Sequence, residues 1–301
     1  MGCIPFLLTI MTLLIGTETW KHNRIKPRFM GEKVSLKAIQ PRYRRVQERI
    51  VDLHNRMRAH VQPPSSNMLV MRWDKFAAKA AQKWADRCRL LENSSVDDRW
   101  HDQLGACGQN IFISMHRVPW LFALRTWYLE KDTFSYGSHN VSSKEHGHFL
   151  QMVWATSHKV GCGLAHCLHT SGKPYYTYVC NYCPIGNDPR QLSRPYRRGR
   201  PCGSCPGHCR LKANTCTADD EDCPVQEGSC AAPDCVARPC PELKCSTGRL
   251  CTNACPTVDL WSNCKEINKS FSSWLCHTRS SAGRQRRDGC KATCSCKGLI
   301  Y

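Results

Sequence analysis

The stretch EHGHFLQMVWATSHKVGCGLAHC, from Glu145 to Cys167, combines histidines and cysteines with long apolar runs. Its four histidines and two cysteines are side chains that often bind zinc in proteins. Two of its segments, HFLQMVWA and KVGCGLAHC, also have the composition of β-strands. The stretch therefore leaves two alternatives open, a metal or catalytic site and a structural segment that is rich in ligand types.

The cysteine content and the N-terminus together indicate a secreted, extracellular protein. The chain has 23 cysteines in 301 residues. The apolar run from Ile4 to Ile15 is too short to span a bilayer and has the position of a signal peptide, which we place at residues 1–19. A membrane anchor is the alternative for this run, and no later segment is apolar enough to cross a membrane. Removal of Cys3 with the signal peptide leaves an even number of cysteines. In an exported chain this count favours a disulfide framework, and the N-terminus argues against the alternative of zinc knuckles in a cytosolic protein.

The positive charge is concentrated at the N-terminal end. The formal net charge is +19, and residues 1–45 carry nine Lys and Arg against two Glu. The segment from Arg42 to Arg45 has the form of a dibasic processing site, so residues 20–45 are either a propeptide or a retained basic tail. The remaining charge favours anionic partners such as acidic protein surfaces, anionic glycans or lipid headgroups. A secreted chain is not expected to bind nucleic acid.

The density of cysteines divides the rest of the chain into two parts. Residues 46–189 contain six cysteines, and residues 190–301 contain sixteen. The first part is long enough to bury a core of its own, whereas the second needs disulfides to hold it together.

The pattern of apolar residues predicts helices first and strands later in the first part. Apolar spacing indicates helices over residues 46–57, 74–88 and 119–128, with Asp74 as an N-cap and Pro119 in a first turn. Phe76 is expected on the apolar side of the second helix. Three strand-like runs follow: HFLQMVWA, KVGCGLAHC and YYTYVCNYC. This order predicts an α+β sandwich with helices packed on a sheet.

Several motifs resemble those of a known family. GHFLQMVWATSHKVGCG resembles the signature of the CAP superfamily, LHNRMRAHVQPPSSNMLVMRWD its first helix and the following loop, and YVCNYCPIGN its last strand. PYRRGRPCGSCPGHC and GRLCTNAC…GCKATCSC are similar to the hinge and the ion-channel-regulatory (ShKT-like) domain of cysteine-rich secretory proteins. The resemblance implies a CAP α-β-α sandwich at residues 46–189, a disulfide-rich hinge at 190–251 and a small, mostly helical domain at 252–301. Residues 210–247 form an insertion within the hinge that the family pattern lacks.

The resemblance also implies how sixteen of the cysteines pair. The implied pairs are Cys88–Cys167, Cys107–Cys183, Cys162–Cys180, Cys202–Cys209, Cys205–Cys251, Cys255–Cys296, Cys264–Cys290 and Cys276–Cys294. Six cysteines of the insertion remain, and the sequence allows fifteen pairings among them. They are Cys216, Cys223, Cys230, Cys235, Cys240 and Cys245.

CAP domains commonly present two His and two Glu in a cleft, which binds zinc in some members. The resemblance places His148 and Glu130 at two of these positions, but Gln109 and Asn93 at the other two. An amide is a poor zinc ligand and cannot act as a general base. A residual polar cleft without a cofactor is therefore favoured over a zinc site. For a zinc site, His101 could replace a missing ligand, although its spacing does not match the family pattern.

The other histidines of the opening stretch have simpler interpretations. If His146 and His148 lie on a strand, they share a face because they are two residues apart. They are then either two metal ligands or one residue of the cleft and a solvent-exposed neighbour. His158 and His166 lie close to cysteines that the resemblance places in disulfides, which favours a structural role for both.

Three sequons make the chain a candidate glycoprotein. They begin at Asn93, Asn140 and Asn268. A glycan at Asn93 is incompatible with an open metal cleft.

The resemblance implies a binding protein rather than an enzyme, and no nucleophile motif argues otherwise. We expect this protein to modulate or block an ion channel or another cell-surface protein. It would do so as a venom toxin or as part of a reproductive or defence secretion. The basic clusters RRGR at 197–200 and RQRR at 284–287 are either a contact surface for an acidic partner or, alternatively, a solvated loop or a cleavage site. The aromatics near them, Trp261, Phe271 and Trp274, are either an apolar anchor or a small core. The alternatives are a sterol or lipid carrier and, less favoured, a metal-dependent hydrolase that uses His148.

Overall fold

The computed structural model describes residues 34–90, 92–211 and 249–301. The predicted signal peptide, much of the basic N-terminal segment and the six cysteines of the insertion lie outside the described residues. None of the helices within these ranges is both long and apolar enough to cross a bilayer.

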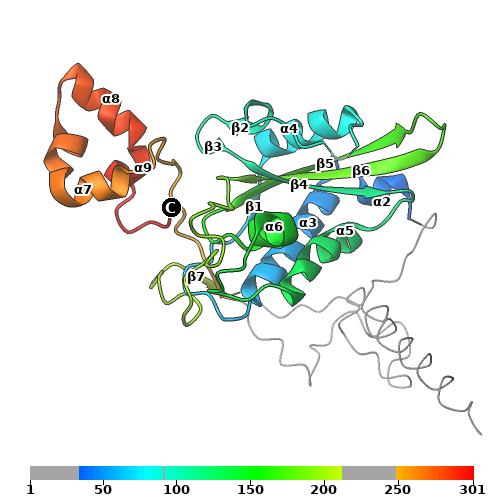
Figure 1. The fold of residues 1–301 in the computed structure, drawn as a ribbon, viewed down its shortest axis with the longest axis horizontal. Coiled ribbons are helices and arrows are strands. Elements are labelled where there is room, and N and C mark those ends of the chain that lie inside the picture. The colour runs from blue at the N-terminus through cyan, green and yellow to red at the C-terminus, as the bar shows by residue number, and fades with distance from the viewer. Residues whose placement is uncertain (1–33, 91, 212–248) are drawn as a thin grey trace, which may run out of the picture.

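A four-stranded sheet forms the centre of the first part of the chain (Figure 1). Its strands, in spatial order, are β1 (Arg72–Trp73), β5 (Lys159–Leu168), β6 (Pro174–Cys183) and β4 (Gly108–Ser114). The long strands β5 and β6 pair antiparallel along their whole lengths, while β4 pairs antiparallel with β6 and β1 runs parallel to β5. The strands predicted for KVGCGLAHC and YYTYVCNYC are confirmed.

Helices cover both faces of this sheet (Figure 1). Helix α4 (Lys75–Asp86) lies on one face, and α3 (Arg44–Ala59), α5 (Trp120–Tyr128) and α6 (Ser143–Val153) lie on the other. The α-β-α sandwich confirms the predicted α+β class. Short elements connect these layers: η2 (Asp97–Arg99), β2 (Trp100–His101), β3 (Gly105–Ala106) and η3 (Leu129–Asp132).

Two glycines of the opening stretch let α4 lie directly on the sheet. A Cβ atom on Gly161 would lie 2.0 Å from the backbone nitrogen of Ala78, and one on Gly163 would lie 2.4 Å from the backbone of Gln82. Any larger residue at either position would push the helix away from β5. The VGCG motif therefore sets the distance between the helix and the strand.

The segment HFLQMVWA, predicted as a strand, belongs to helix α6, so that prediction is wrong. The Ser142 hydroxyl caps the helix by accepting a hydrogen bond from the Glu145 backbone N–H at 3.3 Å. The residues Phe149 to Val153 are all buried, so the run has no polar face, and an unbroken apolar run does not distinguish a strand from a buried helix. Because residues two apart point away from each other on a helix, His146 and His148 do not share a face.

Helix α4 begins as predicted but buries a different face. The Asp74 carboxylate caps it by accepting from the Ala77 backbone N–H at 2.8 Å. Phe76, predicted on the apolar side, is 68% exposed, so that prediction is wrong. The buried stripe runs through Ala77, Ala81 and Trp84, and Phe76 lies just outside it.

Part of the basic N-terminal segment packs against the sandwich. Helix α2 (Leu36–Ile39) ends at Ile39, whose side chain is 1% exposed. The Trp120 indole N–H donates to the Ile39 carbonyl at 2.7 Å. Because α3 begins at Arg44, a cleavage after Arg45 would cut its first turn. Residues 34–45 are therefore part of the folded body.

The hinge leads from the sandwich into the C-terminal unit, by which we mean residues 252–301. Strands β7 (Cys209–Leu211) and β8 (Arg249–Cys251) pair antiparallel. The unit itself contains α7 (Cys264–Ser272), the π-helical turn η5 (Ser273–His277), α8 (Ser281–Gly289) and α9 (Lys291–Ser295). It stands to one side of the sandwich (Figure 1), and this mostly helical, disulfide-linked unit was predicted.

Eight disulfides link the sixteen described cysteines, and each joins a pair that the resemblance implies. They are Cys88–Cys167, Cys107–Cys183, Cys162–Cys180, Cys202–Cys209, Cys205–Cys251, Cys255–Cys296, Cys264–Cys290 and Cys276–Cys294. Three of them lie within the C-terminal unit, whose own buried apolar clusters are small. Disulfides therefore supply much of the stability that a larger domain obtains from its hydrophobic core.

Candidate functional site

The structure brings together His148 and Glu130, two of the four cleft positions. The Glu130 carboxylate Oε1 lies 2.6 Å from Nδ1 of His148, and its Oε2 accepts from the Phe149 backbone N–H at 2.9 Å. The Trp127 indole lies parallel to the imidazole at 6.1 Å between ring centroids. Because a carboxylate only accepts, Nδ1 carries a proton and Nε2 faces away from the pair. The imidazole is thus held in one orientation at a half-exposed surface.

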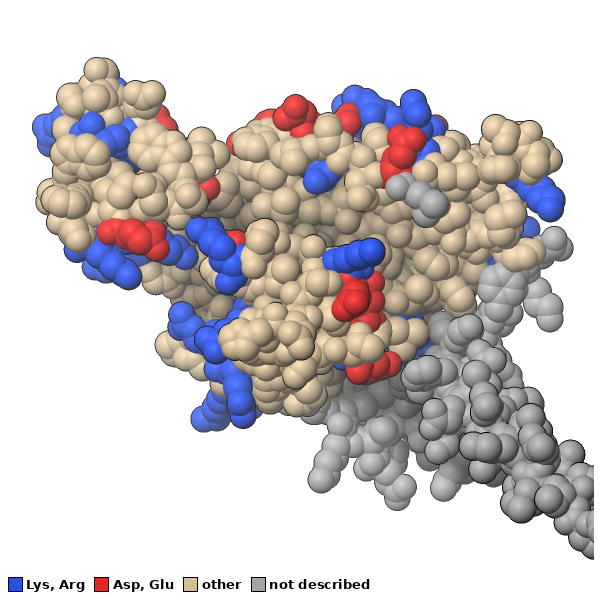
Figure 2. All heavy atoms as spheres, viewed as in Figure 1, with Lys and Arg blue, Asp and Glu red and all other residues tan. Residues whose placement is uncertain are grey.

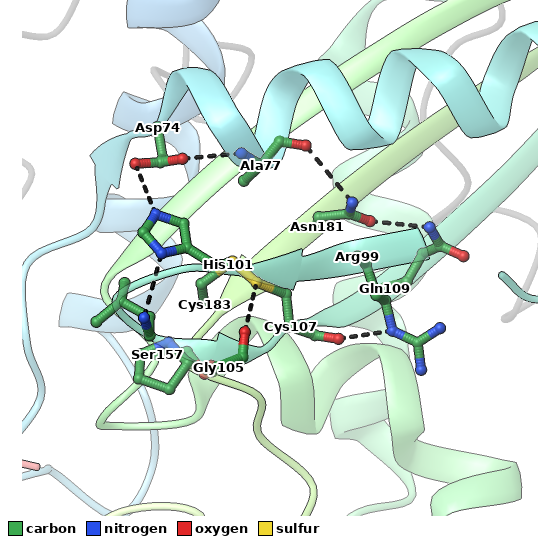
Figure 3. The surroundings of a disulfide bond; sticks show 12 residues. Asp74, Ala77, Arg99, His101, Gly105, Cys107, Gln109, Ser157, Asn181 and Cys183 are labelled. Atoms are coloured by element: carbon green, nitrogen blue, oxygen red, sulfur yellow. Dashed lines mark hydrogen bonds and ion pairs between the residues drawn. A yellow bond between two sulfur atoms is a disulfide. The ribbon is translucent and has the colours of Figure 1, made fainter. Parts of the chain in front are cut away.

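Gln109 is committed to structural hydrogen bonds. Its side-chain oxygen accepts from the Ser94 backbone N–H at 3.1 Å. Its side-chain nitrogen donates to the Asn181 Oδ1 atom at 2.9 Å (Figure 3). A glutamate at this position could accept from Ser94 but could not donate to Asn181 when ionised. The amide therefore ties the loop after α4 to strands β4 and β6.

Too few ligands meet at the cleft for a zinc site. Structural zinc sites use four protein ligands and catalytic sites use three. Among the described residues, Cys202, Cys205 and Cys251 are the one group of three or more His, Cys, Asp or Glu whose ligand atoms come together. These cysteines are disulfide-bonded, so their sulfurs are not thiolate ligands. His148 and Glu130 form a pair without a third such group, and the residues present do not fit zinc.

His101 does not join that pair. Its Nδ1 accepts from the backbone N–H groups of Gln103 and Leu104 at 3.1 and 3.2 Å. Its Nε2 lies 3.6 Å from the Asp74 carboxylate, next to the Cys107–Cys183 disulfide (Figure 3). His101 therefore connects the turn between β2 and β3 to the start of α4.

The remaining histidines of the opening stretch are spread over three environments. His146 is buried, and its Nε2 lies 3.3 Å from the Thr133 hydroxyl. Burial lowers the pKa of His158 to about 4, so its ring is neutral at physiological pH. His166 is exposed and stacks on Tyr176 with ring centroids 4.8 Å apart. The histidines of this stretch do not form one site.

The three sequon asparagines differ in exposure. Asn93 and Asn140 are exposed, whereas Asn268 is half-buried on α7. An attached glycan needs an exposed asparagine, so Asn93 and Asn140 are the better candidates.

Sequence reasoning missed a buried polar chain beneath the cleft. His54 is 0% exposed; it donates from Nδ1 to the Ile50 carbonyl at 2.8 Å and accepts at Nε2 from the Tyr182 hydroxyl at 2.9 Å. Asn110 donates to that hydroxyl at 3.4 Å and to the His148 carbonyl at 3.0 Å. Burial lowers the pKa of His54 to about 4. The signal was present in the sequence, because His54 lies four residues after Ile50 on the same helical face.

A buried arginine was also missed. Arg58 is 1% exposed and donates to the backbone carbonyls of Leu69, Met152, Trp154 and Ala155 at distances of 2.8 to 3.1 Å. One guanidinium thereby joins α3 to the segment that follows α6. Its fork of five donors suits this task, which a lysine could not perform.

The C-terminal unit exposes large apolar side chains beside basic ones. Phe271 is 63% exposed and Trp274 is 51% exposed, and the Arg286 guanidinium lies 3.9 Å from the centroid of the Trp274 ring. The unit has eight Lys and Arg against three Asp and Glu. Within the described ranges, none of these eight cations forms an ion pair with an Asp or Glu side chain. On the face in Figure 2, basic side chains outnumber acidic ones over this unit.

Fold and disulfides define a CAP-type α-β-α sandwich with a cysteine-rich C-terminal extension, and comparisons with known proteins agree. A profile described as Cysteine-rich secretory protein family matches residues 51–182, and one described as Crisp matches residues 235–301. The chain belongs to the cysteine-rich secretory protein family.

Relatives match along nearly the whole chain. Cysteine-rich secretory protein 2 of Cavia porcellus is 35% identical and covers 100% of both chains. Cysteine-rich secretory protein 3 of Homo sapiens is 36% identical and covers 85% of each. Among solved structures, NaASP2 with Zn2+ is similar at 24% identity and a TM-score of 0.44, over 54% of this chain and 90% of that one, and nothing about zinc in this chain follows from it.

Proposed function

We propose that this protein is secreted and acts by binding, and that it modulates or blocks an ion channel or another cell-surface protein. The observation that carries the proposal is the surface of the C-terminal unit, which exposes Phe271 and Trp274 and where Arg286, an arginine without an acidic partner, lies over the Trp274 ring. The family and the eight disulfides fit a protein that works outside the cell.

This surface has the properties of a contact region for an acidic target. Buried aromatic and arginine side chains dominate the binding energy of many interfaces. Phe271 lies at a kink where α7 meets η5, with φ −135° and ψ 42°, and its side chain is exposed. Cations without acidic partners in the same chain attract a negatively charged surface such as the outer mouth of a cation channel. The aromatics supply the apolar contact and the arginines the attraction.

The sandwich offers less to the alternative functions. Among the described residues, the His148–Glu130 pair lacks the further ligands that would hold the metal of a metal-dependent hydrolase. A cavity of about 520 Å³ between α3 and residues 70–73 has a mixed wall, in which Arg44, Glu48 and Asp52 stand beside apolar residues such as Val51 and Met71, so it does not by itself favour a sterol. We therefore place binding by the C-terminal unit ahead of catalysis and lipid transport.

The test is electrophysiology on a panel of potassium channels, calcium channels and ryanodine receptors with the full-length protein. The proposal predicts a reversible change of current for at least one channel, which saturates with protein concentration. Absence of any effect, together with saturable binding of a fluorescent sterol, would favour the lipid-carrier alternative.

A further inference from the structure

Four hinge cysteines lie closer together than their two disulfides require. We call Cys202, Cys205, Cys209 and Cys251 the hinge cluster; its bonds are Cys202–Cys209 and Cys205–Cys251. The sulfur atoms of Cys202, Cys205 and Cys251 all lie within 4.8 Å of one another. Each bond of the cluster therefore has a sulfur of the other bond as a neighbour.

The backbone suits a second pairing of the same four residues. The Cys205 N–H donates to the Cys202 carbonyl at 3.0 Å, which closes a β-turn, and the Cα atoms at the ends of such turns lie within about 7 Å. Disulfides span Cα separations of about 4.4 to 6.8 Å. A Cys202–Cys205 bond is therefore within reach of this turn.

The other two cysteines face each other across a strand pair. Cys209 and Cys251 are register partners in β7 and β8. Residues directly opposite in an antiparallel pair have Cα atoms about 4.5 to 5.5 Å apart. The same relationship joins Cys162 and Cys180, which are register partners in β5 and β6 and form a disulfide with a Cα separation of 4.1 Å.

The members of the cluster differ in exposure. Cys209 is exposed and Cys202 is partly exposed, whereas Cys205 and Cys251 are 1% and 0% exposed. The Cys202–Cys209 bond is therefore the more accessible of the two to a thiol from solution.

We propose that the hinge cluster is a thiol–disulfide exchange site, at which a small thiol or a protein thiol converts the observed pairing into Cys202–Cys205 and Cys209–Cys251. The inference does not depend on the channel proposal. It rests on the sulfur distances, the turn, the strand register and the exposed bond.

The exchange has three steps and no net oxidation. The incoming thiolate attacks the Cys209 sulfur, the Cys202–Cys209 bond breaks, and Cys202 leaves as a thiolate. Cys202 then attacks the Cys205 sulfur and releases Cys251 as a thiolate. Cys251 attacks Cys209 in the mixed disulfide and expels the original thiol, so two disulfides are present before and after.

The exchange would change what holds β8, the strand that leads into the C-terminal unit. In the observed pairing, Cys251 is bonded to the turn at Cys205, and both residues pack on Leu69. In the second pairing, Cys251 is bonded to its neighbouring strand β7, while its backbone hydrogen bonds to Met68 and Val70 can persist. The site would thus connect a thiol in the surroundings to the attachment of the C-terminal unit.

The first test is the full-length variant Cys209→Ser, which leaves Cys202 as a free thiol beside the Cys205–Cys251 bond. The folded protein is unfolded at mildly acidic pH, where exchange is slow, and alkylated with N-ethylmaleimide before peptide mapping. The proposal predicts label at both Cys202 and Cys251. Label at Cys202 alone, or at Cys202 and Cys205, would overturn it. The matched control is Cys167→Ser, which frees Cys88 and should carry label at Cys88 alone.

The second test uses the unmodified chain, so it does not depend on whether a variant folds. The oxidised protein is incubated with reduced glutathione, quenched with acid and examined by tandem mass spectrometry without reduction. The proposal predicts hinge peptides with the Cys202–Cys205 and Cys209–Cys251 bonds, and a glutathione adduct at Cys209 as the intermediate. Recovery of the observed pairing alone, or adducts spread evenly over the exposed disulfides, would contradict it.

Discussion

Glu130 holds the imidazole of His148 by a 2.6 Å contact between Oε1 and Nδ1, while its second oxygen accepts from the backbone of the helix that carries His148. Both carboxylate oxygens therefore contact α6. The contact orders the imidazole but, among the described residues, brings no third His, Cys, Asp or Glu ligand to it.

Zinc should not stabilise the protein. A ligand that binds only the folded state raises the melting temperature as its concentration exceeds Kd. With two ligand groups in place, we expect no change of Tm when Zn2+ is added in a thermal unfolding experiment. A rise of several degrees that disappears in His148→Ala would show that a site exists.

Replacing Gln109 with the glutamate of the family pattern should destabilise this chain. In Gln109→Glu the ionised carboxylate faces the Asn181 oxygen, which now lacks a donor. A buried polar group without its partner costs about 1–3 kcal/mol. Urea unfolding should show that loss, whereas Gln103→Glu, at an exposed position, should unfold like the unmodified protein. Equal stability of Gln109→Glu would refute the role given to the amide.

The protein should lose stability as the pH falls from about 6.5 to about 4. His54 and His158 have folded-state pKa values of about 4, whereas an unfolded histidine titrates near 6.5. The unfolded state therefore binds more protons in this range, and each histidine contributes a slope of about 1.4 kcal/mol per pH unit.

The variant His158→Asn tests this slope. The asparagine keeps a donor for the Thr156 carbonyl but does not titrate. Urea unfolding at a series of pH values should show a slope smaller by about 1.4 kcal/mol per pH unit between pH 4 and 6.5. His60→Asn, at an exposed position, should leave the slope unchanged, and an unchanged slope in His158→Asn would contradict the assignment.

Residues 34–45 should be needed for stability. Ile39→Ala empties a position that is 1% exposed, and such changes cost about 2–5 kcal/mol. Lys37→Ala, at an exposed position of the same helix, is the control. An effect below about 0.5 kcal/mol for Ile39→Ala would mean that the segment is dispensable, as a propeptide would be.

The sequence predicted the two long strands of the sheet, β5 and β6, because their signals are local, but it missed β1 and β4. The strands β5 and β6 carry β-rich composition between breakers, and the VGCG glycines mark the close approach of α4. Helix α6 was misread because its buried run lacks periodicity, although residues 142–145 match the S-x-x-E pattern that indicates a helix start.

The site was less predictable because its decisive contacts are long-range. The position of Gln109 could be aligned, but its bonds to Ser94 and Asn181 depend on how a loop and two strands meet. The burial of Arg58 likewise depends on carbonyls about 95 residues further along the chain.

The most direct test of the proposed function compares the unmodified protein with Phe271→Ala/Trp274→Ala on the channel that it affects most strongly. Both side chains are exposed, so the variant should fold, and Leu168→Ala, 69% exposed on the sandwich, is the matched control. If each anchor contributes about 2 kcal/mol and the two losses add, the half-maximal effect needs a concentration roughly 700-fold higher, with the control unchanged. An unaltered concentration dependence in the double variant would contradict binding through the C-terminal unit.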